Sequence, residues 1–272
     1  VALVSGTGQI SSATFHLEPS RTLWVTTSLR LIRMDVARLF TNWVYNCASF
    51  VNGPVAPGEC IAFYGDDIGP ESLVSATYSA EGNLARTVSD TQVLVNGSAV
   101  PLIFVSKDFS AALMPYGISG TVRLEVQRQG AKTNAIDLTV APTMPGLFTY
   151  VGGTGQIVAV NAENWKFNGP AEPATRGQWM TVFLTGQGAV SPPVGDGVKV
   201  TGDPSWPAPA APVSIKVGGV AVLPDDIWAG LTYQGVTQVN FKIPETAPTG
   251  AVEVLVTIGG ASSQPGATVV LR

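Results

Sequence analysis

The chain has 272 residues and a formal net charge of −4, and charged residues make up only 12% of it. This low charge argues against a nucleic-acid-binding protein, and the 45% of apolar residues argues against a disordered one. The sequence contains no run of 18 or more apolar residues, so it predicts no membrane-spanning helix.

Residues 1–45 are the first predicted unit, an N-terminal arm rich in Val, Thr, Ser and Leu. The runs 1–17 and 22–32 have β-type composition, and residues 33–43 suit a short helix or a further strand. The first residues lack an initiating Met and the basic start and continuous apolar segment of a signal peptide, so we expect either a mature end left by processing or a chain given without its precursor.

A β-rich arm needs a pairing partner, which is either a sheet of its own chain or a sheet of a neighbouring subunit. Residues 6–10 repeat residues 153–157 letter for letter, as Gly-Thr-Gly-Gln-Ile. This short match is compatible with an arm strand that takes, on some sheet, a place like that of the later segment. The predicted strand-donor positions are Val1, Leu3, Ile10, Phe15 and Leu17.

Cys47 and Cys60 flank a turn rich in Gly and Pro at residues 52–58, a spacing that lets two neighbouring strands meet side by side. A disulfide there would close a loop of about 14 residues and add roughly 3 kcal/mol to stability. Two buried thiols are the alternative, and a metal pair is disfavoured because no His or second Cys pair lies at ligand spacing. We favour the disulfide, and with it an oxidising, extracytoplasmic location.

From residue 48 onward, short β-type runs alternate with Gly, Pro and Asn at the intervals typical of sandwiches and barrels. The second half repeats the motif order of the first, which predicts an all-β fold of two tandem Ig-like β-sandwich domains. Their expected bounds are 46–141 and 142–272, with a proline-stiffened connector at 141–146. The matched pairs are 57–65 with 176–186, 92–100 with 213–221, 109–115 with 236–244, and 129–134 with 259–264.

These motifs carry a resemblance over about residues 46–272. The carrying stretches include Ala48-Ser49-Phe50, Val55-Ala56-Pro57-Gly58-Glu59, Pro115-Tyr116-Gly117-Ile118-Ser119-Gly120, Pro145-Gly146-Leu147-Phe148, Phe167-Asn168-Gly169-Pro170 and Gly259-Gly260-Ala261-Ser262-Ser263-Gln264. In this order they resemble the two-repeat Ig-like C-terminal domain family of secreted Solibacter and related acidobacterial proteins, and each repeat is similar to the IPT/TIG type. The resemblance implies secretion, no known enzyme activity and no catalytic residues. Cys47 and Cys60 replace the small or aliphatic residues expected there, which fits a disulfide private to this chain.

Candidate chemistry is sparse. His16 is the sole histidine and has no Ser or Cys signature beside it, so we expect a surface or interface residue rather than a general base. The pairs Asp66–Asp67 and Asp225–Asp226 lack the spacing of a Ca²⁺ loop, and we expect them to cap turns. The sequence therefore predicts no catalytic residues, no metal and no cofactor.

The six tryptophans raise the question of sugar stacking. Trp179 falls in a predicted core strand and is expected to be buried. The candidate ligand-stacking residues lie in predicted loops or turns: Trp165, Trp206 and Trp228.

The sequence thus favours a non-enzymatic extracellular structural protein. Its specific prediction is a filament or surface-fibre subunit, a homo-oligomer joined by β-strand addition of the arm. Two alternatives stay open, namely a secreted glycan-binding or adhesion module with a polysaccharide partner, and a spacer or accessory domain of a larger secreted protein.

Overall fold

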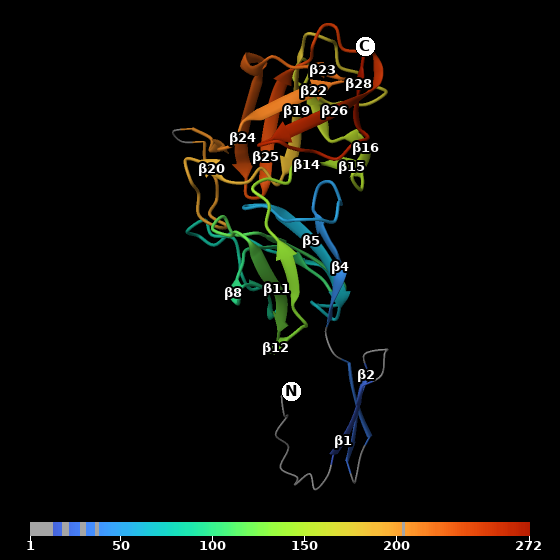
Figure 1. Ribbon diagram of the computed structural model, residues 1–272, viewed down its shortest axis with the longest axis vertical. Coiled ribbons are helices and arrows are strands. Elements are labelled where there is room, and N and C mark those ends of the chain that lie inside the picture. Colours follow the sequence, from blue (N-terminus) through green and yellow to red (C-terminus); the bar gives the residue numbers. More distant parts are fainter. Residues whose placement is uncertain (1–12, 18–21, 28–30, 36–37, 203–204) are drawn as a thin grey trace.

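The computed structural model describes residues 13–17, 22–27, 31–35, 38–202 and 205–272. In these residues the chain is all-β, as predicted, with two tandem Ig-like sandwiches preceded by a separate N-terminal meander (Figure 1). The helical structure described is one 3-10 turn, η1 (Pro224–Asp226). No helix of the described part is long and apolar enough to cross a membrane.

The N-terminal meander is a sheet of its own, in the order β1-β2-β3. Both of its pairings are antiparallel, and Figure 1 shows it apart from the sandwiches. Its strands are β1 (Ala13–Leu17), β2 (Thr22–Thr27) and β3 (Leu31–Asp35).

The first sandwich packs a sheet of order β4-β5-β10-β9-β6 against one of order β12-β11-β7-β8, in which β13 also pairs with β11. The first sheet contains β4 (Arg38–Asn46), β5 (Cys60–Asp66), β6 (Val74–Ser75), β9 (Leu102–Val105) and β10 (Phe109–Leu113). The second contains β7 (Thr91–Val95), β8 (Ser98–Ala99), β11 (Thr121–Arg128), β12 (Ala131–Lys132) and β13 (Ile136–Thr139).

Strand β4 alters the predicted boundary of this domain. It pairs with β5 from Arg38 onward, so the first sandwich begins ahead of residue 46. For residues 33–43 the sequence predicted either a short helix or a strand, and the described part of this segment is strand. The last part of the arm therefore completes a sheet of its own chain.

The second sandwich pairs a sheet of order β18-β17-β19-β25-β24, to which β14 adds on β19, with a sheet of order β15-β16-β28-β26-β22-β23. The first sheet contains β14 (Gly146–Leu147), β17 (Ala159–Asn161), β18 (Lys166–Phe167), β19 (Trp179–Thr185), β24 (Ile227–Tyr233) and β25 (Val236–Lys242). The second contains β15 (Thr149–Val151), β16 (Thr154–Ile157), β22 (Val213–Val217), β23 (Val220–Ala221), β26 (Gly250–Ile258), β27 (Ala261–Ser262), which pairs with β26, and β28 (Ala267–Leu271). A small ribbon of β20 (Val190–Ser191) and β21 (Ala208–Pro209) lies beside β24.

Each sandwich has its own apolar core between its two sheets. Alternate residues of the central strands point inward, as in β5, where Ile61 and Phe63 are fully buried, and in β19, where Met180 and Val182 are fully buried. The residues between them lie on the outer face of each sheet.

Candidate binding faces and the domain junction

The predicted disulfide is present and lies at the junction between the sandwiches. Cys47 directly follows β4 and Cys60 begins β5, and their Cα atoms are 5.4 Å apart. The Cys47 N–H donates to the carbonyl of Cys60 at 2.9 Å, so the backbone already holds the two residues side by side. The described residues contain no free cysteine.

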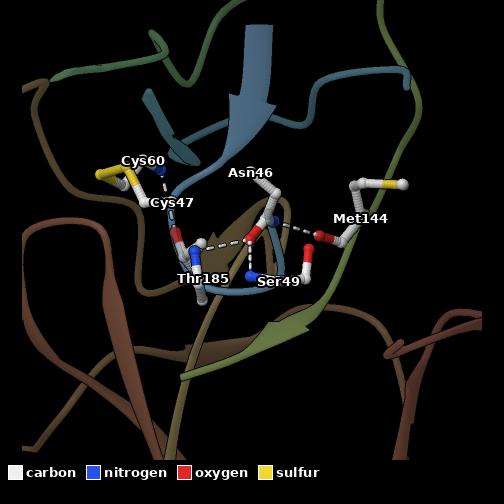
Figure 2. The surroundings of a disulfide bond; sticks show 7 residues. Asn46, Cys47, Ser49, Cys60, Met144 and Thr185 are labelled. Carbon is white, nitrogen blue, oxygen red and sulfur yellow. Dashed lines mark hydrogen bonds between the residues drawn. A yellow bond between two sulfur atoms is a disulfide. The ribbon is translucent and has the colours of Figure 1, made fainter. Parts of the chain in front are cut away.

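Hydrogen bonds around the disulfide tie the two sandwiches together (Figure 2). The Cys60 N–H donates to Thr185 Oγ1 at 2.9 Å, and the Asn46 side-chain Nδ2 donates to the carbonyl of Met144 at 3.0 Å. Asn46 Oδ1 accepts the N–H groups of Ala48 and Ser49, each at 3.0 Å. Because Asn46 and Thr185 are buried, these polar groups stabilise one arrangement of the two domains.

Two further contacts close the junction. Gly153 has a φ of +94° and packs so closely on the Ser49 carbonyl that no Cβ would fit. Gly235 lies in the turn between β24 and β25, and a Cβ at this position would lie only 2.5 Å from Leu113 Cδ2 of the first sandwich. The second sandwich thus covers the end of the first at close range.

A loop of the second sandwich, residues 196–199, forms hydrogen bonds with the first sandwich. The Leu84 N–H donates to Gly197 O at 2.8 Å, and the Lys199 N–H donates to Gly82 O at 2.7 Å. Asp196 Oδ1 accepts the Tyr116 N–H at 2.8 Å. These contacts add a second hydrogen-bonded connection between the domains, well away from the disulfide in the sequence.

Glu59 is an acidic residue buried next to the disulfide. Burial raises its carboxyl pKa from 4.5 to about 8, and the Ala56 N–H and the Asn46 side chain counteract this only in part. At neutral pH the carboxyl is therefore mostly uncharged inside the protein.

Trp165 and Trp206 lie in a turn and a loop as predicted, whereas Trp228 lies in strand β24, so its predicted loop placement is wrong. Trp165 is 79% exposed at the turn between β17 and β18, and Trp206 and Trp228 are 38% and 37% exposed. The structure brings Trp206 and Trp228 together over Gly230, whereas Trp165 lies at the opposite edge of the sheet. The prediction that Trp179 is buried is wrong, because this residue occupies an outward position of β19 and is 39% exposed.

One register row crosses the outer face of this sheet. It runs from Phe167 through Val160, Thr181 and Asn240 to Trp228. We define the Trp face as four residues of this row and three further outward residues of β19 and β25, namely Phe167, Thr181, Asn240 and Trp228 with Trp179, Gln238 and Lys242.

The first sandwich carries an aromatic group that sequence reasoning missed. Tyr64 and Phe109 are in register on β5 and β10, with ring centroids 4.5 Å apart. Trp43 lies 5.6 Å from Tyr64, and Phe104 lies 5.2 Å from Phe109. We call this set the aromatic ladder; its members are Trp43, Tyr45, Tyr64, Phe104 and Phe109. The sequence does show aromatic residues in β4, β5 and β10, but only the order of the strands in the sheet shows that these residues form one group.

The predicted strand donors are placed only in part. Val1, Leu3 and Ile10 lie outside the described residues. Phe15 and Leu17 lie in β1, where they are in register with residues of β2 in the same chain. The described residues hold no cluster of three or more His, Cys, Asp or Glu suited to a metal ion.

Comparison with known proteins gives structural neighbours alone. No protein-family model and no curated protein matches the chain, so the acidobacterial resemblance stays a prediction. Among solved structures, an SGBP-B from a xyloglucan utilization locus of Bacteroides uniformis is 15% identical, with 78% of this chain and 46% of that chain covered and a TM-score of 0.27. A Bacteroides ovatus SGBP-B in complex with a mixed-linkage heptasaccharide is 12% identical, with 100% and 68% covered and a TM-score of 0.36. The adhesin FdeC of Escherichia coli is 16% identical, with 92% and 72% covered and a TM-score of 0.24. This chain thus spans less than half the length of the first of these proteins, and such low scores carry no inference about its ligand.

Proposed function

We propose that the chain is a non-enzymatic extracellular structural subunit that assembles with copies of itself. The observation that carries the proposal is the aromatic ladder, an apolar sheet face on the outside of the first sandwich. Trp43 is 48% exposed at one end of it, and neighbouring Phe50 is also exposed. The other ladder residues are partly buried, so the group forms a partly exposed aromatic cluster, a feature common at protein interfaces.

The N-terminal meander offers a matching surface. Its register pairs Phe15 with Val25 and Val25 with Ile32, and two positions along it pairs Leu17 with Leu23 and Leu23 with Met34. A sheet of this size needs to pack against another surface to be stable.

Assembly follows if the meander of one copy covers the ladder of the next. Such a contact joins two different surfaces and, unless it closes into a ring, it produces an open filament. The edge strand β1 adds backbone groups for β-strand addition, in which Phe15 and Leu17 would serve as donors. The disulfide supports an oxidising location outside the cytoplasm.

The test is sedimentation and negative-stain microscopy of the full chain. We expect the wild type to form long particles, and we expect the double variants Trp43→Ser/Tyr64→Ser and Phe15→Asp/Leu17→Asp to remain single subunits. Tyr150→Ser, at an exposed position of β15, is the control and should still assemble. A monomeric wild type, or assembly that neither double variant weakens, would refute the proposal.

A second candidate function is adhesion to a polysaccharide. The exposed tryptophans of the second sandwich favour it, because aromatic rings exposed beside polar groups are suited to stacking on sugars. It does not compete with assembly, since the ladder and the Trp face lie on different domains.

A further inference from the structure

We infer that the Trp face of the second sandwich is a binding site for a neutral, extended polysaccharide chain. The inference rests on the second candidate function above and is independent of self-assembly.

The row of side chains has the length and composition of a linear site. Phe167 on β18 and Trp228 on β24 are four strands apart in register, which separates them by about 19 Å at a strand spacing of about 4.8 Å. Phe167 is 60% exposed, and Trp179 lies two residues along β19 from the row. A straight chain of several sugar rings can therefore contact aromatic groups at both ends of the face.

The ring of Trp228 occupies space that is free because residue 230 is a glycine. A Cβ on Gly230 would lie 2.7 Å from Trp228 Cη2 and 3.0 Å from Trp206 Cβ. The indole thus lies over Gly230, with Trp206 beside it. A ring fixed in this way loses little rotamer freedom on binding, which favours affinity.

Polar groups between the aromatic residues are oriented in advance. Asn240 Oδ1 accepts hydrogen bonds from Thr181 Oγ1 at 2.8 Å and from Gln238 Nε2 at 3.0 Å. Because two hydrogen bonds hold its oxygen, the amide of Asn240 is fixed in orientation, and its Nδ2 group is a hydrogen-bond donor. Sugar hydroxyl groups are natural acceptors for such donors.

The charge of the face selects the ligand class. Among the seven residues that define the Trp face, Lys242 alone is charged. Recognition of an acidic polymer depends on clustered cations, particularly bidentate Arg side chains, and the face contains no Arg. Stacking and neutral hydrogen bonds suit an uncharged chain.

Affinity electrophoresis of the full chain tests the inference, with hydroxyethylcellulose and neutral mixed-linkage β-glucan as probes and alginate as the acidic comparison. We expect at least one neutral polymer to retard the wild type and alginate to leave its mobility unchanged. Trp228→Ala and Phe167→Ala should each weaken the retardation at least tenfold. Gly230→Ala, which displaces the Trp228 ring without removing it, should weaken it several-fold.

Tyr150→Ala is the matched control, because it removes an exposed aromatic residue from the other sheet of the same sandwich and should leave retardation intact. Thermal unfolding of each variant confirms that it remains folded. If no neutral polymer retards the wild type, both the site and the adhesion function fail. If retardation persists in Trp228→Ala and Phe167→Ala, or if alginate alone retards, the site assignment fails.

Discussion

Strands β5 and β19 occupy equivalent central places in the two sandwiches, and they differ in what covers them. The repeat aligns Cys60 with Trp179 and Ala62 with Thr181. The inward residues between them are apolar and fully buried in both strands. The core positions thus follow the same packing rule in both domains.

The outward positions follow their surroundings instead. Cys60 is buried because the disulfide and the turn at Gly235 cover it. Trp179, its counterpart, faces solvent at the Trp face. Just before these residues, Glu59 is buried at the junction whereas the equivalent Gln178 is exposed. The start of β5 is thus part of the domain interface whereas the start of β19 lies on an open face, and substitutions can separate these two roles.

The largest expected effect concerns Glu59. Its pKa is about 8 in the folded protein and 4.5 when unperturbed, so the folded state holds a proton that the unfolded state releases. Stability should therefore fall as pH rises from about 4.5 to about 8, by about 5 kcal/mol at most. Glu59→Gln, which installs the residue of the second sandwich, should remove this slope in denaturant unfolding.

Glu71→Gln is the control for this experiment, since Glu71 lies at the surface and forms an exposed ion pair with Lys107. It should keep the wild-type slope between pH 4.5 and 8. A wild type whose stability is level or rises across that window would contradict the assignment of a buried neutral carboxyl.

The next effect concerns the disulfide. Replacing both cysteines by Ser frees a loop with a sequence separation of 13 residues and should cost about 3 kcal/mol of unfolding free energy. Guanidinium unfolding of the double variant measures this cost. The oxidised and reduced wild type should differ by a similar amount, and the double variant should be insensitive to reductant.

The fold was largely predictable because its signals are local. Alternating runs, turn residues and the order of repeated motifs predicted the all-β fold, and the Cys spacing around a Gly/Pro turn predicted the disulfide.

The binding faces were not predictable, because they depend on register between strands far apart in the sequence. Trp179 begins an apolar run, and nothing local shows that its first residue points outward. Tyr64 and Phe109 meet only because β5 and β10 are neighbours. The β4 start at Arg38 was missed for the same reason, since its pairing with β5 is not a local pattern.

A smaller effect is expected at Thr185, the inner end of β19. Its hydroxyl accepts the buried N–H of Cys60 across the junction. Thr185→Val keeps the shape but leaves that donor without an acceptor, at a cost of about 2 kcal/mol in chemical unfolding. An unchanged stability would show that the junction does not depend on this bond.

The smallest effect on stability is expected at Thr181, four residues earlier on the same strand. Thr181→Val removes a neutral hydrogen bond to Asn240 on the outer face, and Val suits a strand, so the cost should be within about 1 kcal/mol. Asn240 would lose one of the two bonds that orient its amide, so retardation by a neutral polysaccharide should weaken several-fold. Thr185→Val should show the reverse pattern, with lower stability and unchanged retardation. If both variants changed stability alike and left retardation untouched, the outer face of β19 would have no part in ligand binding. Strands β5 and β19 would then differ in burial alone.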